Sequence, residues 1–271
     1  MSAAAAPALE FDRVSRDFIA PGGETYRAVD DLSFAIEPGA FVALVGPSGC
    51  GKSTVLNMAA GLLAPSSGRV RVDGVELAGL NRHATYMFQQ DALLPWKTIR
   101  DNVALGLTLS GVARQESRAR VDSWLERVGL SAFASHYPAQ LSGGMRKRAA
   151  MAQNWIIDRG MLLMDEPFSA LDVHTRQRME SELLALWEAR DASAKKTVVF
   201  VTHDLEEAIA LADDVIVLSA GPASRMVARH AVPLERPRDL FELRTSAAFV
   251  DLYKSIWSVL REEVRKVELR A

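Results

Sequence analysis

The sequence predicts an α/β fold built on a mostly parallel sheet, with an antiparallel β edge and an inserted helical subdomain. Short, continuous apolar runs recur along the chain between turn residues, as in strands that are buried on both faces. Helical patterns separate these runs, and the alternation of strands with helices is typical of α/β domains. The third observation is a long, mainly helical stretch, residues 91–141, that interrupts the alternation.

The expected elements follow one another in a definite order. Residues 8–40 and 68–77 have the pattern of short strands with turns and form the antiparallel edge. The buried strands are expected at 41–46, 85–88, 161–166, 197–203 and 215–219, and helices at 52–62, 115–128 and 175–190. Near the end, over 239–265, Phe249, Leu252, Ile256 and Leu260 recur at helical spacing and predict an amphipathic helix packed on the core.

Composition describes an ordinary globular chain. Its 271 residues suffice for one large domain or two small ones, and 49% of them are hydrophobic. The 32 basic and 34 acidic residues nearly balance, so the charge gives no reason to expect a nucleic-acid partner. Cys50 is the single cysteine, which excludes an internal disulfide and suits a reducing compartment. Because no stretch of about 18 apolar residues occurs, a membrane role requires a partner that holds the chain there.

The segment GPSGCGKST, residues 46–54, has the pattern G-x-x-x-x-G-K-[ST] of a phosphate-binding loop. It follows an apolar strand and opens a helix, which is the context that this pattern requires. Lys52 is expected to neutralise phosphate oxygens, and Ser53 offers a hydroxyl to Mg²⁺. The residues expected to bind ATP here are Gly46, Pro47, Ser48, Gly49, Cys50, Gly51, Lys52, Ser53 and Thr54. Cys50 also lies near a helix N-terminus, which predicts a lowered thiol pKa, although a buried and inert thiol is the alternative.

The segment MLLMDEP, residues 161–167, is an apolar strand that ends in two acidic residues, and we expect these acids to complete the phosphate site. The apolar strand is expected to deliver Asp165 beside the phosphate loop, where it holds Mg²⁺ through water. Glu166 is then placed to orient or deprotonate the attacking water. An acidic pair after a strand also suits a solvated turn, but the nearby phosphate loop favours the catalytic interpretation.

A second turn that suits an anion, LSGG, opens another expected helix at residues 141–144. With it, six motifs occur in the order found in ABC-type ATPases, and the chain resembles that family over about residues 8–220. The motifs that resemble the family's are the Walker A loop (46–54), the Q-loop glutamine Gln89, the signature (141–145), the Walker B strand (161–166), the D-loop SALD (169–172) and the switch histidine His203.

The resemblance explains why one chain carries two phosphate-seeking turns. In this family the signature turn caps ATP that is held by a second subunit, and two chains pack head to tail around two ATP molecules. It therefore implies a second ATPase subunit, either an identical chain or a close paralogue, and ATP hydrolysis with Mg²⁺. The implied catalytic residues are Lys52, Gln89, Glu166 and His203; Ser53, Gln89 and Asp165 hold Mg²⁺; Leu141, Ser142, Gly143, Gly144 and Asp172 act on the partner's ATP.

Two positions depart from the family pattern or leave it open. Met145 stands where many members have glutamine, and we expect little loss because the preceding serine and glycines contact phosphate. The aromatic ring that stacks on adenine is expected to be Phe18, with Tyr26 as the alternative because the turn between them is long.

Two further stretches, residues 88–107 and the segment after residue 235, resemble the nitrate/sulfonate/taurine subfamily of bacterial importers. The resemblance implies a peripheral subunit on the cytoplasmic face of the bacterial inner membrane, bound to transmembrane permease subunits and served indirectly by a solute-binding protein. The alternatives are an importer of another small solute, such as a vitamin precursor, a soluble ABC protein acting on ribosomes or DNA, and a small-molecule kinase.

The expected organisation is a disordered tail (1–7), an ABC ATPase domain (8–222) with its helical subdomain at about 91–155, and a C-terminal extension (223–271) packed on the core. Just after Gln89, Leu93, Leu94 and Trp96 form an apolar cluster. Such a cluster is either part of the core or a groove that receives a permease helix, and we expect the permease contact here.

Overall fold

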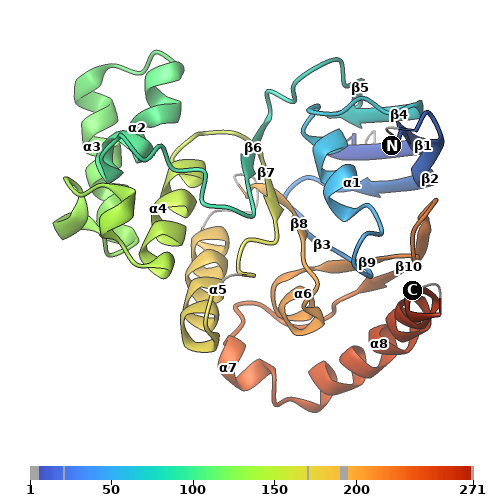
Figure 1. Ribbon diagram of the computed structural model, residues 1–271. Helices are drawn as coiled ribbons and strands as arrows, with labels where there is room; N and C mark the ends of the chain where they lie inside the picture. The colour runs from blue at the N-terminus through green and yellow to red at the C-terminus, as the bar shows by residue number, and fades with distance from the viewer. Residues whose placement is uncertain (1–5, 21, 170, 190–194, 270–271) are drawn as a thin grey trace, which may run out of the picture.

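The computed structural model describes residues 6–20, 22–169, 171–189 and 195–269 and confirms the predicted α/β fold class (Figure 1). The central sheet has six strands in the order β10-β9-β3-β8-β7-β6, and all neighbours pair in parallel except β10 with β9. Its strands are β3 (Phe41–Val45), β6 (Ala84–Met87), β7 (Met161–Asp165), β8 (Thr197–Val201), β9 (Asp214–Leu218) and β10 (Met226–Ala231). The carboxyl ends of β3, β7 and β8 therefore meet at one edge of the sheet.

The antiparallel strands form a second sheet rather than an edge of the first. Its order is β2-β1-β4-β5, with β1 at Leu9–Ile19, β2 at Thr25–Ile36, β4 at Ser67–Val72 and β5 at Val75–Glu76. One face of β1 and β2 is buried together with α1 (Lys52–Ala59) and residues of the central sheet. Helix α1 joins the two sheets, because it contacts β2 on one side and β7 and β8 on the other, and all three bury one apolar core.

A group of helices extends to one side of the central sheet and contacts it at β6 (Figure 1). It consists of α2 (Ile99–Leu109), α3 (Arg114–Arg127), two single 3₁₀ turns (Ser131–Phe133 and Pro138–Gln140) and α4 (Gly143–Trp155). These elements share a hydrophobic core of their own. The side chains of Thr98 and Ser142 accept hydrogen bonds from the first turns of α2 and α4 and so define where both helices begin.

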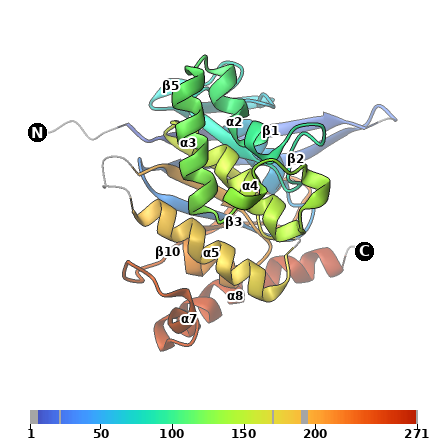
Figure 2. The same cartoon turned by 90° about the vertical axis from the view of Figure 1, so that its left-hand side faces the viewer.

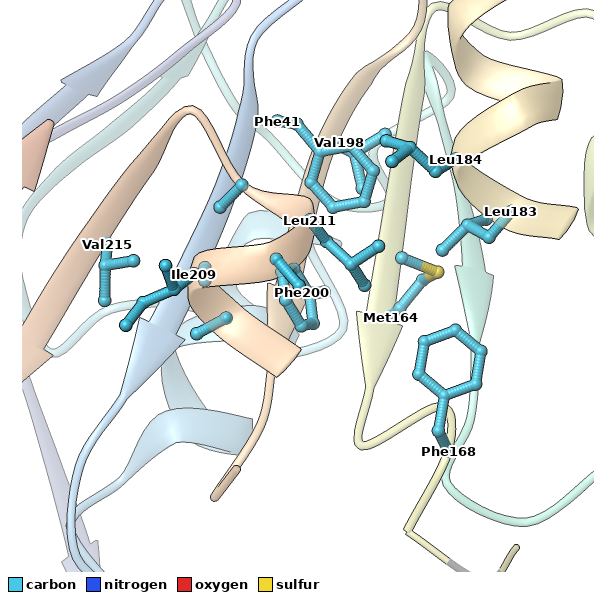
Figure 3. Close-up of a cluster of buried hydrophobic side chains, with 14 of the residues drawn as sticks. Phe41, Met164, Phe168, Leu183, Leu184, Val198, Phe200, Ile209, Leu211 and Val215 are labelled. Carbon is cyan, nitrogen blue, oxygen red and sulfur yellow. The ribbon is translucent and has the colours of Figure 1, made fainter. Parts of the chain in front are cut away.

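The other face of the central sheet is covered by α5 (Val173–Glu188) and α6 (Leu205–Leu211), whose apolar residues meet Phe41, Met164 and Phe200 (Figure 3). Within the described ranges, none of the helices has the length and apolar character needed to cross a bilayer. Residues 1–5 of the expected tail lie outside the described residues.

The expected C-terminal helix is divided into α7 (Leu240–Leu243) and α8 (Ala247–Glu268). The break falls at Ser246, whose hydroxyl accepts the N–H of Phe249 at 3.2 Å and caps α8. Phe249, Ile256 and Leu260 are buried against the core, as their spacing predicts.

Candidate functional site

The phosphate-binding loop lies between β3 and α1, and its backbone requires glycine at defined positions. Gly51 has φ +91°, in the left-handed region that other residues avoid. A Cβ on Gly46 would lie 2.7 Å from Cys50 Sγ, so no larger residue fits there. Lys52 Nζ donates to the carbonyl oxygens of Gly46 at 2.8 Å and Pro47 at 3.0 Å, which holds the ammonium group against the loop.

Asp165, at the end of β7, lies against the start of α1. Its Oδ1 accepts the hydroxyl of Ser53 at 3.0 Å, and its Oδ2 accepts the hydroxyl of Tyr86 at 3.4 Å. Burial raises the pKa of Asp165, and the hydrogen bond from Ser53 opposes that shift. A hydroxyl beside a carboxylate is the hard oxygen donor set that suits Mg²⁺. Among the described residues, no group of three or more His, Cys, Asp or Glu side chains is arranged to hold a metal.

Three polar side chains converge beside this pair. Glu166 Oε2 accepts from Gln89 Nε2 at 3.1 Å and lies 3.3 Å from His203 Nδ1. The backbone of Glu166 has φ +43°, which is uncommon for a residue other than glycine and typical of functional sites. The Glu166 N–H donates to the Val201 carbonyl at 2.9 Å, which anchors this conformation to β8.

A hollow of about 360 Å³ lies between the phosphate-binding loop and the antiparallel sheet. It is lined by Phe18, Tyr26, Ala28, Ser48, Gly49, Gly51, Lys52, Ser53, Thr54 and Glu166. Phe18 and Tyr26 are direct cross-strand neighbours in β1 and β2, so their side chains lie on the same face of the sheet. Both rings line the hollow, and the choice of Phe18 for adenine stays a prediction.

The signature turn lines a different hollow, of about 480 Å³. Ser142 caps α4, and Asp172 caps α5 by accepting the Thr175 N–H at 3.0 Å. Hydrogen bonds from the side chain and then the backbone of Thr175 lower the pKa of Asp172. The positive ends of both helices therefore border one space, and α4 and α5 lie side by side (Figure 2). Among the described residues, none lines both this hollow and the one above the phosphate loop.

The side chains of Leu141 and Cys50, both in the sequence-based site, are buried. Leu141 is packed in the core of the helical group, so its side chain does not face the hollow beside the signature turn. Cys50 is fully buried, and burial raises its thiol pKa. The prediction of a lowered pKa was therefore wrong, because desolvation outweighs the effect of Lys52 and of the nearby N–H groups. Ala170, within the D-loop, lies outside the described residues.

The sequence did not predict a contact between the signature helix α4 and the Q-loop. Lys147 on α4 is 3% exposed, and its Nζ donates to the Gln89 carbonyl at 2.5 Å and lies 3.4 Å from Asp91. Burial lowers the pKa of Lys147. The helix that begins at the signature is thus tied to the backbone of the Q-loop. A lysine in a basic helical segment is expected to face solvent. The contact therefore becomes visible only in the folded structure.

The residues of the expected apolar cluster after Gln89 lie in two different environments. Leu93 packs against two of the hydrophobic cores, whereas Trp96 is 71% exposed. A separate groove of about 370 Å³ lies between the helical group and the central sheet. It is lined in part by Tyr86, Phe88, Leu109 and Ile157, of which Phe88 and Leu109 are exposed. The rings of Tyr86 and Phe88 lie 4.5 Å apart between centroids.

A carboxylate that is held by a glutamine and a histidine beside a phosphate loop suits the attack of water on a terminal phosphate. This arrangement defines the class: an ATP-hydrolysing P-loop protein. The chain belongs to the ABC transporter family, whose profile it matches over residues 29–169.

Similar proteins cover almost the whole chain. The Taurine import ATP-binding protein TauB of Rhizobium johnstonii is 44% identical over 258 residues, which cover 93% of this chain and 96% of the relative. The Nitrate import ATP-binding protein NrtD of Synechococcus elongatus is 40% identical over 233 residues, or 85% and 83% of the two chains. The solved ATP-binding cassette MJ0796, described as dimeric, post-hydrolysis and bound to ADP and Pi, matches with TM-score 0.72 and 30% identity over 84% of this chain and 100% of its own.

Proposed function

We propose that this chain is the ATP-binding and ATP-hydrolysing subunit of an importer for a small oxyanion such as nitrate, a sulfonate or taurine. The observation that carries the proposal is the likeness, over more than four-fifths of the chain, to proteins named for taurine import and nitrate import. Such a subunit works on the cytoplasmic face of a bacterial inner membrane, where it is attached to permease subunits. A solute-binding protein delivers the solute to these permease subunits.

The active unit in this proposal is a head-to-tail pair of chains. The hollow above the phosphate loop and the hollow beside the signature turn share no described residue, which supports separate roles on two nucleotides. In the pair, Ser142 and the N–H groups of Gly143 and Gly144 approach ATP held by the partner subunit. The dimeric description of the MJ0796 cassette supports this assembly. The second chain is an identical copy or a close paralogue.

Hydrolysis then uses groups of both hollows. Lys52 leaves the carbonyls of its own loop for the β- and γ-phosphate oxygens. Glu166 accepts the proton of the attacking water, while Gln89 and His203, which contact this carboxylate, fix its direction. Ser53, Asp165 and Gln89 would hold Mg²⁺, which offsets phosphate charge when it is bound. Loss of the γ-phosphate weakens the contact with the partner's signature turn, so the pair opens.

The permease contact in this proposal extends from Trp96 along the groove that contains Phe88 and Leu109. All three side chains are exposed, and exposed large apolar groups beside a groove suit a short amphipathic helix. Tyr86 links the groove to the nucleotide site, because its ring lines the groove and its hydroxyl donates to Asp165. Leu93 and Leu94, the other residues of the expected contact, are partly buried, and Leu93 also packs against two of the hydrophobic cores.

Replacing Trp96 with glutamate tests the contact. The Trp96→Glu chain should bind ATP like the parent chain, because the side chain is exposed and away from the phosphate loop. It should fail to co-purify with the permease and should not support uptake. Trp257→Glu on α8 is the matched control, since Trp257 is also exposed, and it should assemble normally. Normal assembly and transport by Trp96→Glu would place the contact elsewhere.

The solute is tested on the intact importer. Cells that lack this chain should lose uptake of one labelled oxyanion, and the chain, but not its Glu166→Gln variant, should restore it. Mass spectrometry of the ligand bound to the co-purified solute-binding protein identifies the solute. Recovery of an uncharged compound or a vitamin precursor would refute the oxyanion assignment while leaving the importer assignment intact.

A further inference from the structure

The turn between β9 and β10, residues 220–224, lies directly against the phosphate loop. A Cβ on Gly221 would lie 2.9 Å from the carbonyl oxygen of Gly49 and 3.5 Å from Cys50 Cα. The backbone of the turn therefore touches the backbone of the loop, and a side chain at Gly221 would push the two apart. The turn belongs to the segment that leads into the C-terminal extension, and it has no part in the hydrolysis scheme above.

The same turn is bound to strand β2. The N–H of Ala223 donates to the Arg27 carbonyl at 2.7 Å, and the N–H of Ser224 donates to the Ala28 carbonyl at 3.1 Å. The Ser224 carbonyl in turn accepts the N–H of Asp30 at 2.9 Å. Ala28 lines the hollow above the phosphate loop from the side of the antiparallel sheet, and glycines of the loop line it from the other side. One turn thus connects two walls of the nucleotide hollow.

The start of the turn is held by a buried acid near the end of α8. Glu263 is 4% exposed, and its Oε2 accepts the N–H of Ala220, itself buried, at 2.8 Å. Its other oxygen binds Lys266. The end of α8 lies beside β9 and β10, so the helix reaches the turn from the face opposite the phosphate loop (Figure 1). A hydrogen bond to a carboxylate is stronger than one between neutral groups, and a buried N–H left without its acceptor is costly.

We propose that Glu263 is a positioning residue for ATP binding: through Ala220 it holds the turn 220–224 between the phosphate loop and β2, so that the hollow keeps the shape that ATP requires. The inference deepens the proposed function and rests on the binding of ATP at the phosphate loop. It gives the C-terminal extension a role in nucleotide affinity, although none of its described residues lines the hollow. Without the bond to Glu263 the turn is in place in fewer molecules, and the apparent affinity for ATP falls in proportion.

The first test measures the dissociation constant of MgATP by equilibrium dialysis. In Glu263→Ala it should rise about tenfold, which corresponds to about 1.4 kcal/mol. Glu263→Gln keeps a side-chain oxygen that accepts the Ala220 N–H, so it should bind ATP within about threefold of the parent chain. Glu262→Ala is the matched control, since it removes the same charge from the neighbouring, exposed position of the same helix, and it should bind like the parent.

A general loss of stability would give a different result from a loss of positioning. Unfolding of some molecules lowers the number of ATP sites but leaves the dissociation constant of the remaining sites unchanged. In steady-state hydrolysis, Glu263→Ala should raise KM for ATP about tenfold and keep kcat within about twofold of the parent, because saturating ATP selects the molecules in which the turn is in place. A lowered kcat with an unchanged KM would show a merely structural role and would overturn the proposal.

Cys50 reports the state of the phosphate loop directly, because it is the single cysteine and is buried beside the turn. Without nucleotide, a thiol reagent should label folded Glu263→Ala about tenfold faster than the parent or Glu262→Ala, since the loop opens more often. Saturating MgATP should return the variant to the slow rate of the parent, because it favours the molecules with the turn in place.

Two further variants keep the inference testable and separate it from its premise. Where Glu263→Ala does not fold, Glu263→Asp keeps the charge but withdraws it from Ala220, and it should also weaken ATP binding. Gly221→Ala acts on the contact with the loop from the other side and should weaken binding too. Parent-like ATP binding by folded Glu263→Ala or Glu263→Asp, or by Gly221→Ala, would refute the positioning role alone. Failure of the parent chain itself to bind MgATP, or unchanged binding by Lys52→Ala, would instead refute the proposed ATP site.

Discussion

The contact between α4 and α5 beside the signature turn allows one substitution to be predicted in detail. Gly144 and Gly143 are adjacent but meet different surroundings. A Cβ on Gly144 would lie 2.7 Å from Thr175 Cγ2, whereas a Cβ on Gly143 would meet nothing closer than Arg146 Nη2 at 3.9 Å. Neither glycine has a positive φ, so alanine suits the backbone at both positions. Gly144→Ala should therefore force α4 away from α5, and Gly143→Ala should not.

The expected magnitudes follow from these distances. Carbon atoms pack at roughly 3.5–4.0 Å, so the contact at 2.7 Å is a true overlap. Overpacking of this kind costs about 1–3 kcal/mol. Replacing glycine by alanine at a compatible position contributes about 0.4–1 kcal/mol of stability through the unfolded chain. With the middle of each range, about 2 and about 0.7 kcal/mol, Gly144→Ala should lose about 1.3 kcal/mol, equivalent to a melting temperature lower by about 3–5 °C at this size, while Gly143→Ala should melt at or slightly above the parent temperature.

Thermal unfolding by calorimetry, without nucleotide, checks this prediction. Thr175→Ser removes the methyl group that the new Cβ would meet, and it keeps the backbone N–H that Asp172 accepts. The double variant Gly144→Ala/Thr175→Ser should therefore recover most of the loss. If Gly144→Ala melts like Gly143→Ala, or if Thr175→Ser gives no recovery, the close packing of α4 on α5 is wrong.

The remaining predictions concern the residues of the phosphate loop and the carboxylate beside it. Lys52→Ala should bind ATP at least about tenfold more weakly in equilibrium dialysis, because a direct charge–phosphate contact is lost. Glu166→Gln should bind ATP normally but turn it over at least about 100-fold more slowly, since the general base is lost, and a parent-like rate would refute this assignment. Cys50 should react slowly with a thiol reagent, and equally slowly with and without MgATP, because it is buried with a raised pKa; fast labelling that MgATP suppresses would support the original prediction from the helix N-terminus.

Much of the fold and of the phosphate site is predictable from sequence because it depends on local patterns. The apolar runs predict five of the six strands of the central sheet to within about two residues. They do not predict β10, because it is an edge strand without a continuous apolar run. The phosphate loop and the Asp165–Glu166 pair are short motifs with fixed spacing, and the structure brings Ser53 within 3.0 Å of Asp165. Gln89 and His203 follow from the order of the family's motifs rather than from their own surroundings.

What the sequence did not predict depends on burial by distant segments. Glu207 and Lys147 look like solvated helix residues, and both are buried only because α5, α8 and the Q-loop pack over them. The error at Cys50 has the same origin, because a local helix argument ignores desolvation. The break before α8 was accessible, since Ser246 precedes an apolar helical pattern and serine is a favoured N-cap.

The central claim is that the signature turn of one chain completes the ATP site of another. Ser142→Arg, placed in a Glu166→Gln background that retains ATP, tests it most directly by light scattering of the purified chain with MgATP. The Glu166→Gln chain should form a dimer, and the added Ser142→Arg change should leave it monomeric although each chain still binds ATP, because the phosphate loop lies in a separate hollow. Ser255→Arg, on the exposed side of α8, is the matched control and should dimerise. An ATP-dependent dimer of the Ser142→Arg chain, or loss of ATP binding by its monomer, would contradict the account.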